Sequence, residues 1–296
     1  MHIEQLWIVL MVKGKRIVIT GAHSPLGSAA LKALQKHTNC HVIALVTPWH
    51  SGFAFTQTED RLTILEQDLR LPLTQTVVRE ISRADIVLHF AWFRHADVHK
   101  ATTVNKLIIR QILVYLPSAS RFVFISSVGA SAGTRSVYGK AKWEVAQVIE
   151  GKGGLVLVCG LVASDPPFGP YAILMRWIQK SWIRPRFFAP HVPVYLTPMK
   201  RLTATILMLT KRSTKPGVYR IFDTPATNLN YILVKFEGNF KFLRPLFPIP
   251  TWILIKTVNL LQGLNFFPAS LLDKLLTFLT KDRAYLDSLE AVLGED

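Results

Sequence analysis

Short apolar runs alternate with amphipathic stretches along the first half of the chain. Runs of four to six residues rich in Val, Ile and Leu are typical of strands, and the stretches between them carry apolar residues at helical spacing. We expect strands at 16–20, 41–46, 62–65, 86–90, 121–125 and 155–158. We expect helices at 28–36, 74–83, 102–116 and 138–150.

Strands that are apolar on both faces and alternate with helices indicate a parallel sheet that helices cover on both sides. The sequence therefore predicts an α/β protein with a doubly wound, Rossmann-type sheet over residues 13–165. Proline and aromatic residues become frequent after that, which predicts a smaller, mostly helical substrate lobe over 166–296. An apolar run at 218–222 is expected to return to the main sheet. Residues 1–12 are expected to form an N-terminal extension, too short to span a bilayer.

A glycine-containing turn lies between the first expected strand and the first expected helix. Glycines let the backbone turn sharply and approach a pyrophosphate, which the helix N-terminus then stabilises. The sequence therefore predicts a phosphate-binding turn, although an ordinary strand–helix connection is the alternative. The candidate cofactor-binding residues of this turn are Gly21, His23, Ser24, Pro25, Leu26 and Gly27.

Tyr138 and Lys142 are four positions apart on an expected helix, so their side chains share one face. A nearby ammonium group favours the tyrosinate form and prepares the phenol for proton transfer. Ser127 follows the fifth expected strand and can donate a hydrogen bond to a substrate oxygen. We take these three residues as catalytic candidates, with an ordinary polar surface as the alternative.

Four further segments occur in order with these two motifs, and they are Gln67–Arg70, Leu88–Ala91, Thr103–Lys106 and Phe124–Ser127. Together the segments resemble the extended short-chain dehydrogenase/reductase superfamily, particularly its NAD-dependent epimerase/dehydratase branch that acts on nucleotide sugars. The resemblance covers most of residues 15–165 and implies a Rossmann fold and a nicotinamide cofactor.

By this resemblance Tyr138 is the acid/base, Lys142 holds the nicotinamide ribose, and Ser127 orients the substrate oxygen. The resemblance also implies cofactor contacts for Asp68, Leu69, Phe90, Ala91 and Asn105. Two alternatives stay open, because Asp68 could be a helix cap and Asn105 a buried structural amide.

The chain also departs from the family pattern. Ser24 stands where the family has its middle glycine, and Pro25 follows it. Cys159-Gly160 stands where Arg-Pro is common in the family. Ser127 and Tyr138 are only eleven positions apart, and no acidic residue occurs around Thr197-Pro198. These departures leave the fold expectation intact and the substrate class open.

The choice between NAD and NADP depends on charge near the end of the second strand. An acidic residue there accepts hydrogen bonds from the ribose 2′-hydroxyl and repels a 2′-phosphate. No Asp or Glu occurs from Gly21 through Thr58, where Thr47, His23 and His50 are the polar candidates. The sequence therefore favours NADP, with NAD as the alternative.

The net charge is +16 and the sequence pI about 10.0, which indicates an anionic partner. No acidic residue occurs between Asp165 and Asp223, a stretch that is rich in Lys and Arg. A solvated surface, a cradle for a substrate diphosphate and peripheral contact with an anionic membrane all fit this stretch. No zinc-finger or RNA-binding spacing occurs, so we expect neither a metal site nor nucleic-acid binding. Only Cys40 and Cys159 occur, which favours a reducing, cytoplasmic compartment.

The leading hypothesis is an NAD(P)-dependent oxidoreductase or epimerase that acts on a carbonyl or hydroxyl of a nucleotide-linked sugar, with a homodimer implied by the resemblance. The stretch Pro248–Thr280 resembles the tail of bacterial enzymes of surface-polysaccharide biosynthesis. One alternative is a reductase of the same family that acts on a hydrophobic ketone or alcohol at a membrane surface. Another alternative is a non-catalytic protein that binds and senses NAD(P).

Overall fold

The computed structural model describes residues 14–48, 61–180, 184–188, 193–223, 226–228, 232, 246–250, 286 and 289–291. The expected N-terminal extension and most of the expected C-terminal lobe lie outside the described residues, as does His50. The division into domains therefore stays a prediction.

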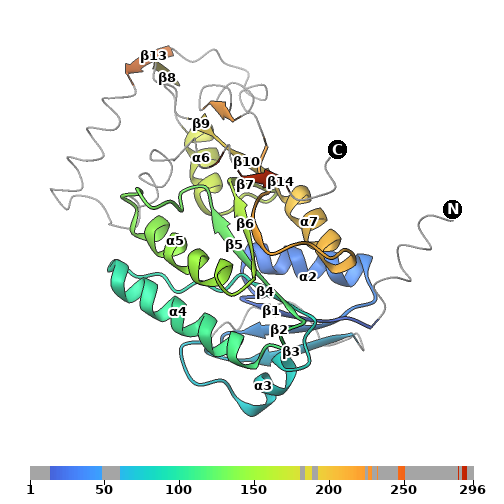
Figure 1. The fold of residues 1–296 in the computed structure, drawn as a ribbon. Helices are drawn as coiled ribbons and strands as arrows, with labels where there is room; N and C mark the ends of the chain where they lie inside the picture. Colours follow the sequence, from blue (N-terminus) through green and yellow to red (C-terminus); the bar gives the residue numbers. More distant parts are fainter. Residues whose placement is uncertain are drawn as a thin grey trace, which may run out of the picture.

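One parallel sheet organises the described part of the chain, in the strand order β3-β2-β1-β4-β5-β6-β11-β14 (Figure 1). The strands are β1 Arg16–Thr20, β2 His41–Val46, β3 Leu62–Glu66, β4 Ile86–His89, β5 Arg121–Ser127, β6 Leu155–Cys159, β11 Gly217–Arg220 and β14 Glu290–Ala291. All these strands are parallel, and the order in which the chain adds them to the sheet reverses between β1 and β4. Ligands bind at such a switch point in doubly wound sheets. The predicted Rossmann-type fold is confirmed.

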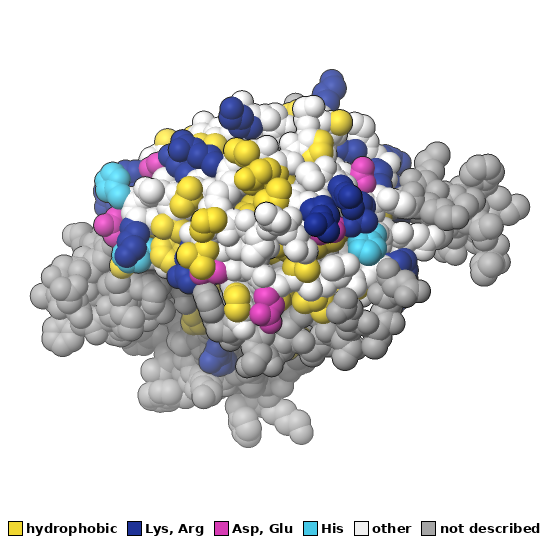
Figure 2. Space-filling model, turned by 90° about the horizontal axis from the view of Figure 1, so that it is seen from below, with side chains coloured by type: hydrophobic (Ala, Val, Ile, Leu, Met, Phe, Trp, Pro, Cys, Tyr) yellow, Lys and Arg dark blue, Asp and Glu magenta, His cyan; other side chains and the backbone are white. Residues whose placement is uncertain are grey.

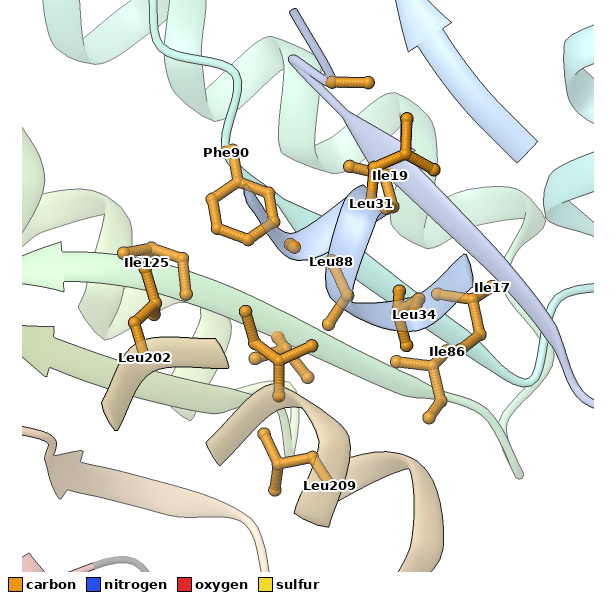
Figure 3. Packing of buried hydrophobic residues seen from close by; sticks show 14 of the residues in the cluster. Ile17, Ile19, Leu31, Leu34, Ile86, Leu88, Phe90, Ile125, Leu202 and Leu209 are labelled. Carbon is orange, nitrogen blue, oxygen red and sulfur yellow. The ribbon is translucent and has the colours of Figure 1, made fainter. Parts of the chain in front are cut away.

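Helices cover both faces of this sheet (Figure 1). On one face lie α2 Pro25–His37 and α7 Met199–Lys211, which pack against each other and against the buried side chains of the strands. Figure 3 shows this layer, in which Leu31 lies beside Ile19, and Leu34 lies beside Ile17 and Ile86. The opposite face is covered by α3 Gln75–Ile81, α4 Val98–Tyr115 and α5 Val137–Glu150. These two layers leave the carboxyl ends of the strands as the edge where a site can form.

Beyond β6, in addition to α7, β11 and β14, the described chain forms α6 and three two-stranded pairings. Their elements are β7 Leu161–Ala163 with β10 Leu196–Pro198, β8 Arg184–Phe188 with β13 Leu246–Pro250, β9 Pro193–Val194 with β12 Thr227–Asn228, and α6 Gly169–Lys180. The chain at Gly160 packs directly against the chain at Tyr195, because a Cβ added to Gly160 would lie 2.1 Å from the Tyr195 carbonyl oxygen. Thr197 Oγ1 accepts a 2.8 Å hydrogen bond from the Gly160 N–H. Gly160 and Thr197, two positions where the sequence differs from the pattern described above, are therefore in direct contact.

Helix capping explains why two helices begin earlier than expected. The side chain of Ser24 caps α2, whose first residue is Pro25, a position where the missing N–H of proline costs nothing. The carboxylate of Asp97 accepts hydrogen bonds from the N–H groups of His99 and Lys100, so α4 begins at Val98. In both cases a polar side chain ahead of the apolar pattern satisfies the free N–H groups of the first turn.

The face in Figure 2 carries several groups of Lys and Arg side chains, few acidic ones and hydrophobic side chains between them. Within the basic stretch of residues 166–222, some cations are already engaged. Arg201 pairs with Asp223 at 3.1 Å and donates to the carbonyl oxygen of Phe222. No helix among the described residues is long and apolar enough to cross a membrane.

Candidate active site

The turn after β1 is built so that backbone, rather than side chains, lines it. Gly21 has φ +64°, a conformation that residues with a Cβ rarely adopt. A Cβ on Gly21 would lie 2.7 Å from the Ala91 nitrogen, so the turn passes directly against the chain that follows β4. The Ser24 N–H donates to the Gly21 carbonyl oxygen at 2.9 Å and closes the turn.

Ser24 has a defined role in this turn. Its Oγ accepts a 3.1 Å hydrogen bond from the Gly27 N–H, which makes it the N-cap of α2. Gly27 permits the close approach of helix and strand, because an added Cβ would lie 2.4 Å from the Gly21 carbonyl oxygen. Pro25 is exposed, His23 and Leu26 are partly buried, and Leu26 packs against the core. All six candidates of the turn therefore lie together, with serine supporting the turn where the family has glycine.

Thr47 follows β2 at the same edge of the sheet. Its Oγ1 is buried and has no hydrogen-bond partner among the described residues. A buried hydroxyl without a partner is uncommon, because removing it from water costs about 1–3 kcal/mol. Thr47 thus offers a polar atom for a ligand at the end of β2.

Asp68 and Leu69 follow β3, and their side chains have different surroundings. The carboxylate of Asp68 binds Arg70 through a fork, at 3.0 Å from Oδ1 to Nε and 2.8 Å from Oδ2 to Nη2. Hydrogen bonding to the Arg70 side chain is the main cause that lowers the pKa of Asp68. Leu69 is 7% exposed and packs in the core on the α4 side of the sheet. Asp68 is therefore a fixed anion at the edge, whereas the Leu69 side chain faces the core.

A buried polar pair joins β1 and β4 at the switch point. Thr20 Oγ1 and His89 Nδ1 are 2.8 Å apart, and the Ala91 N–H donates to Thr20 Oγ1 at 3.4 Å. Burial, with a smaller contribution from Lys142, lowers the pKa of His89 to about 3, so the imidazole is neutral. Phe90 is 9% exposed and belongs to the core on the α2 side. The pair and the backbone at Ala91 hold the two strand ends in register.

Asn105 clamps the loop between β4 and α4. It is fully buried; its Oδ1 accepts from the Phe93 N–H at 3.0 Å. Its Nδ2 donates to the carbonyl oxygens of Phe93 at 2.8 Å and Ala101 at 2.7 Å. These contacts match the structural-amide alternative of the sequence analysis, and any cofactor contact of Asn105 stays a prediction.

The start of α5 is packed closely against the loop after β5. Ser136 Oγ caps the helix by accepting from the Gly139 N–H at 3.0 Å. Gly139 touches the loop directly, because an added Cβ would lie 2.2 Å from the Gly129 carbonyl oxygen. Ser127, whose Oγ accepts from the Gly129 N–H at 3.3 Å, ends β5 beside this contact. The short connection between Ser127 and Tyr138 is therefore accommodated by two glycines that touch.

Lys142 lies in a cage of aromatic rings below Tyr138. Its Nζ is 4.3 Å from the centroid of Trp92, 4.4 Å from that of Phe124 and 5.7 Å from that of Tyr138. The same Nζ donates a 2.6 Å hydrogen bond to the Ile125 carbonyl oxygen. Burial is the main cause that lowers the pKa of Lys142 to about 7. The lysine and the tyrosine are thus brought together as their spacing predicts.

The loop after β4 supplies two further residues to Tyr138 that sequence reasoning missed. Trp92 meets Tyr138 edge-on at 5.8 Å between ring centroids. The Arg94 guanidinium lies over the Tyr138 ring at 5.7 Å from its centroid. The only signal in the sequence is a pair of aromatic residues and a cation directly after the Leu88–Ala91 segment.

The strand order, the switch point and the glycine turn define a doubly wound fold of Rossmann type. No protein-family model matches the chain, and no curated protein sequence is significantly similar to it.

Solved structures do share the fold. A UDP-glucose 4-epimerase from Thermotoga maritima, solved with UDP-glucose, is 17% identical with a TM-score of 0.61, over 79% of this chain and 85% of that chain. A dTDP-glucose 4,6-dehydratase from Streptomyces venezuelae, solved with NAD, is 16% identical with a TM-score of 0.61, over 79% of this chain and 84% of that chain. The terminal R domain of the myxalamid biosynthetic pathway is 14% identical with a TM-score of 0.62, over 94% of this chain and 87% of that chain. At these low identities, the TM-scores of 0.61, 0.61 and 0.62 show a common fold.

Proposed function

We propose that the protein is an NAD(P)-dependent oxidoreductase or epimerase that acts on a carbonyl or hydroxyl of a nucleotide-linked sugar. The observation that carries the proposal is the position of Lys142 Nζ 5.7 Å from the centroid of the Tyr138 ring, with Ser127 at the end of β5, the strand that pairs with β4 at the switch point. Tyrosine and lysine at this distance suit proton transfer, and a ligand at the switch point lies within reach of both.

The residues at the strand ends fit a dinucleotide. Gly21 and Gly27 let the turn pack closely against Ala91 and against the start of α2, and the N-terminus of α2 favours the negative charge of a pyrophosphate. Thr47 Oγ1 would bind the adenosine ribose, and Asp68 and the neighbouring backbone would border the adenine. When bound, the nicotinamide supplies a hydride acceptor or donor.

The chain's own residues would carry the proton. The Tyr138 phenol gives a proton to, or takes it from, the substrate oxygen, and Ser127 Oγ donates a hydrogen bond to the same oxygen. The positive charge of Lys142 favours the tyrosinate form. In this structure one N–H of that lysine donates to the Ile125 carbonyl oxygen.

NADP is the proposed preference. No acidic residue follows β2 through Thr58, so nothing from this segment repels a 2′-phosphate. Thr47→Asp places a carboxylate where Thr47 Oγ1 lies and should weaken NADPH binding at least tenfold while NADH binding is retained or improved. Titration of both cofactors by nicotinamide fluorescence measures this change, and an unaltered ratio would remove Thr47 from the ribose site.

Two observations support the substrate class. Solved structures that share this fold over about four fifths of the chain include a UDP-glucose epimerase and a dTDP-glucose dehydratase. The strong positive charge of the chain suits a diphosphate. The expected homodimer and peripheral membrane contact stay predictions.

Tyr138→Phe tests the proposed chemistry. The variant keeps the ring that packs against Trp92 and loses only the hydroxyl, so cofactor affinity should be unchanged. Turnover of a nucleotide-sugar substrate should fall by a factor on the order of 10² to 10⁴, the usual contribution of a general acid or base. Unchanged turnover would exclude Tyr138 from the mechanism.

A further inference from the structure

Arg94 lies beside the proposed acid/base and is held there by a fixed loop. The guanidinium is 5.7 Å from the centroid of the Tyr138 ring, and the residue is exposed. On one side of Arg94 the loop is clamped by Asn105, which binds both backbone groups of Phe93. On the other side Asp97 anchors the loop as the cap of α4. Arg94 is therefore presented at the site by backbone that is fixed at both ends.

No acidic side chain pairs with Arg94 among the described residues. The contrast with Arg70 is informative, because Arg70 lies in the same region and its charge is taken up by the fork with Asp68. Asp97, the nearest acidic residue along the chain, instead accepts hydrogen bonds from the first turn of α4. The guanidinium of Arg94 thus keeps its hydrogen-bonding capacity for a ligand.

A second cation lies close to the first. Lys142 is buried under the same tyrosine, and repulsion from Arg94 contributes to the lowering of its pKa. Cys159 does not compensate for this charge, because burial raises the pKa of its thiol to about 12 and keeps it neutral. The guanidinium over the Tyr138 ring has no carboxylate partner among the described residues, and it therefore attracts an anion; Lys142 adds to this attraction when it is protonated.

We propose that Arg94 binds an anionic group of the substrate, a phosphate or a carboxylate, next to the carbon on which Tyr138 acts. Arginine suits both groups, since its planar fork donates two parallel hydrogen bonds to either. The proposal rests on the proposed function, because it names the chemistry that the substrate presents beside Tyr138. A nucleotide-linked sugar supplies such a group either as its diphosphate or as the carboxylate of an oxidised sugar.

Binding measurements on the full chain test the proposal. UDP-glucose, UDP-glucuronate and inorganic phosphate are titrated by calorimetry, with and without saturating NADP⁺, into the wild type and into Arg94→Gln, Arg94→Lys and Lys140→Gln. Lys140 is the matched control, an exposed cation on the same helix as Tyr138. Arg94→Lys keeps the charge and loses the fork.

Arg94→Gln should weaken binding of at least one UDP-sugar by a factor on the order of 10 to 100, the loss of a charge-assisted hydrogen bond. Lys140→Gln should change it less than twofold. If Arg94→Gln loses affinity for both UDP-sugars, the group that Arg94 binds is the diphosphate. If the loss is confined to UDP-glucuronate, that group is the carboxylate. Arg94→Lys should retain part of the affinity.

The proposal is overturned if the wild type binds none of the three probes, if Arg94→Gln binds them as the wild type does, or if both glutamine variants lose affinity equally. NADPH and NADH titrations on the same samples separate this result from the proposed function. Failure of the wild type to bind either cofactor counts against the proposed function alone, since Arg94 is judged by the anion probes. A loss of NADPH affinity alone in Arg94→Gln would assign the guanidinium to the cofactor and refute the substrate role.

Discussion

Replacing Lys142 by methionine should stabilise the fold at low pH and remove activity. Methionine fills a similar volume between Trp92 and Phe124 and introduces no charge into the cage. Burial lowers the pKa of Lys142 from 10.5 to about 7, which corresponds to roughly 5 kcal/mol against the buried ammonium. The variant should therefore be up to about 5 kcal/mol more stable than the wild type below pH 7, because the shift in pKa already includes the contacts of the ammonium with its surroundings.

The pH dependence of this difference is the sharper test. Between pH 7 and about 10.5 the unfolded chain holds a proton on Lys142 that the folded chain has released. The stability of the wild type therefore rises with pH across this window by about 1.4 kcal/mol per unit, and below pH 7 the contribution is constant. Methionine cannot titrate, so the stability advantage of the variant should shrink above pH 7 by about 1.4 kcal/mol per pH unit.

Urea unfolding of the wild type and Lys142→Met, followed by circular dichroism at pH 6, 7, 8 and 9, measures the difference. Lys140→Met is the control, since Lys140 is exposed on the same helix. If the difference in unfolding free energy between wild type and Lys142→Met does not change with pH, this lysine does not have a low pKa. If Lys142→Met is less stable than the wild type at pH 6, burial of the ammonium does not carry the stated cost.

Substitutions at three further positions test the construction of the site. Gly21→Ala should destabilise the fold by about 3 kcal/mol in urea unfolding, because φ +64° disfavours alanine and its Cβ meets backbone at 2.7 Å; a change under about 1 kcal/mol would contradict this. Ser24→Ala should cost about 1 kcal/mol through the lost cap and Ser24→Gly only a few tenths, and equal costs would deny the capping role. Trp92→Leu should lower kcat about tenfold while Trp92→Phe retains most of it, because a ring is what contacts Tyr138 and Lys142; equal kinetics and pH profiles in the two variants would exclude this positioning role.

The strands were the most predictable part of the fold. The predicted bounds of β1 and β2 agree with the structure, since a strand buried on both faces leaves an unbroken apolar run in the sequence. Helix starts were less predictable, because the caps Ser24 and Asp97 precede the apolar pattern on which the prediction rests. Each cap is a polar residue that stands just ahead of the helix in the sequence.

In the candidate site, contacts between residues close in the sequence could be predicted, and contacts between distant segments could not. The pairing of Tyr138 with Lys142 follows from spacing within one helix, and the fork between Asp68 and Arg70 is equally local. The aromatic cage and the position of Arg94 depend on a loop more than forty residues earlier in the chain. Contacts of that kind arise from the packing of β4 beside β5, which no local pattern encodes.

The central claim is that the edge of the sheet at β1 and β4 binds a nicotinamide dinucleotide. Titration of the purified chain with NADPH and with NADH, followed by nicotinamide fluorescence, tests it most directly. The account predicts saturable binding of NADPH, weaker binding of NADH, and the same NADPH affinity in Tyr138→Phe. A folded sample that changes the fluorescence of neither cofactor would contradict the account.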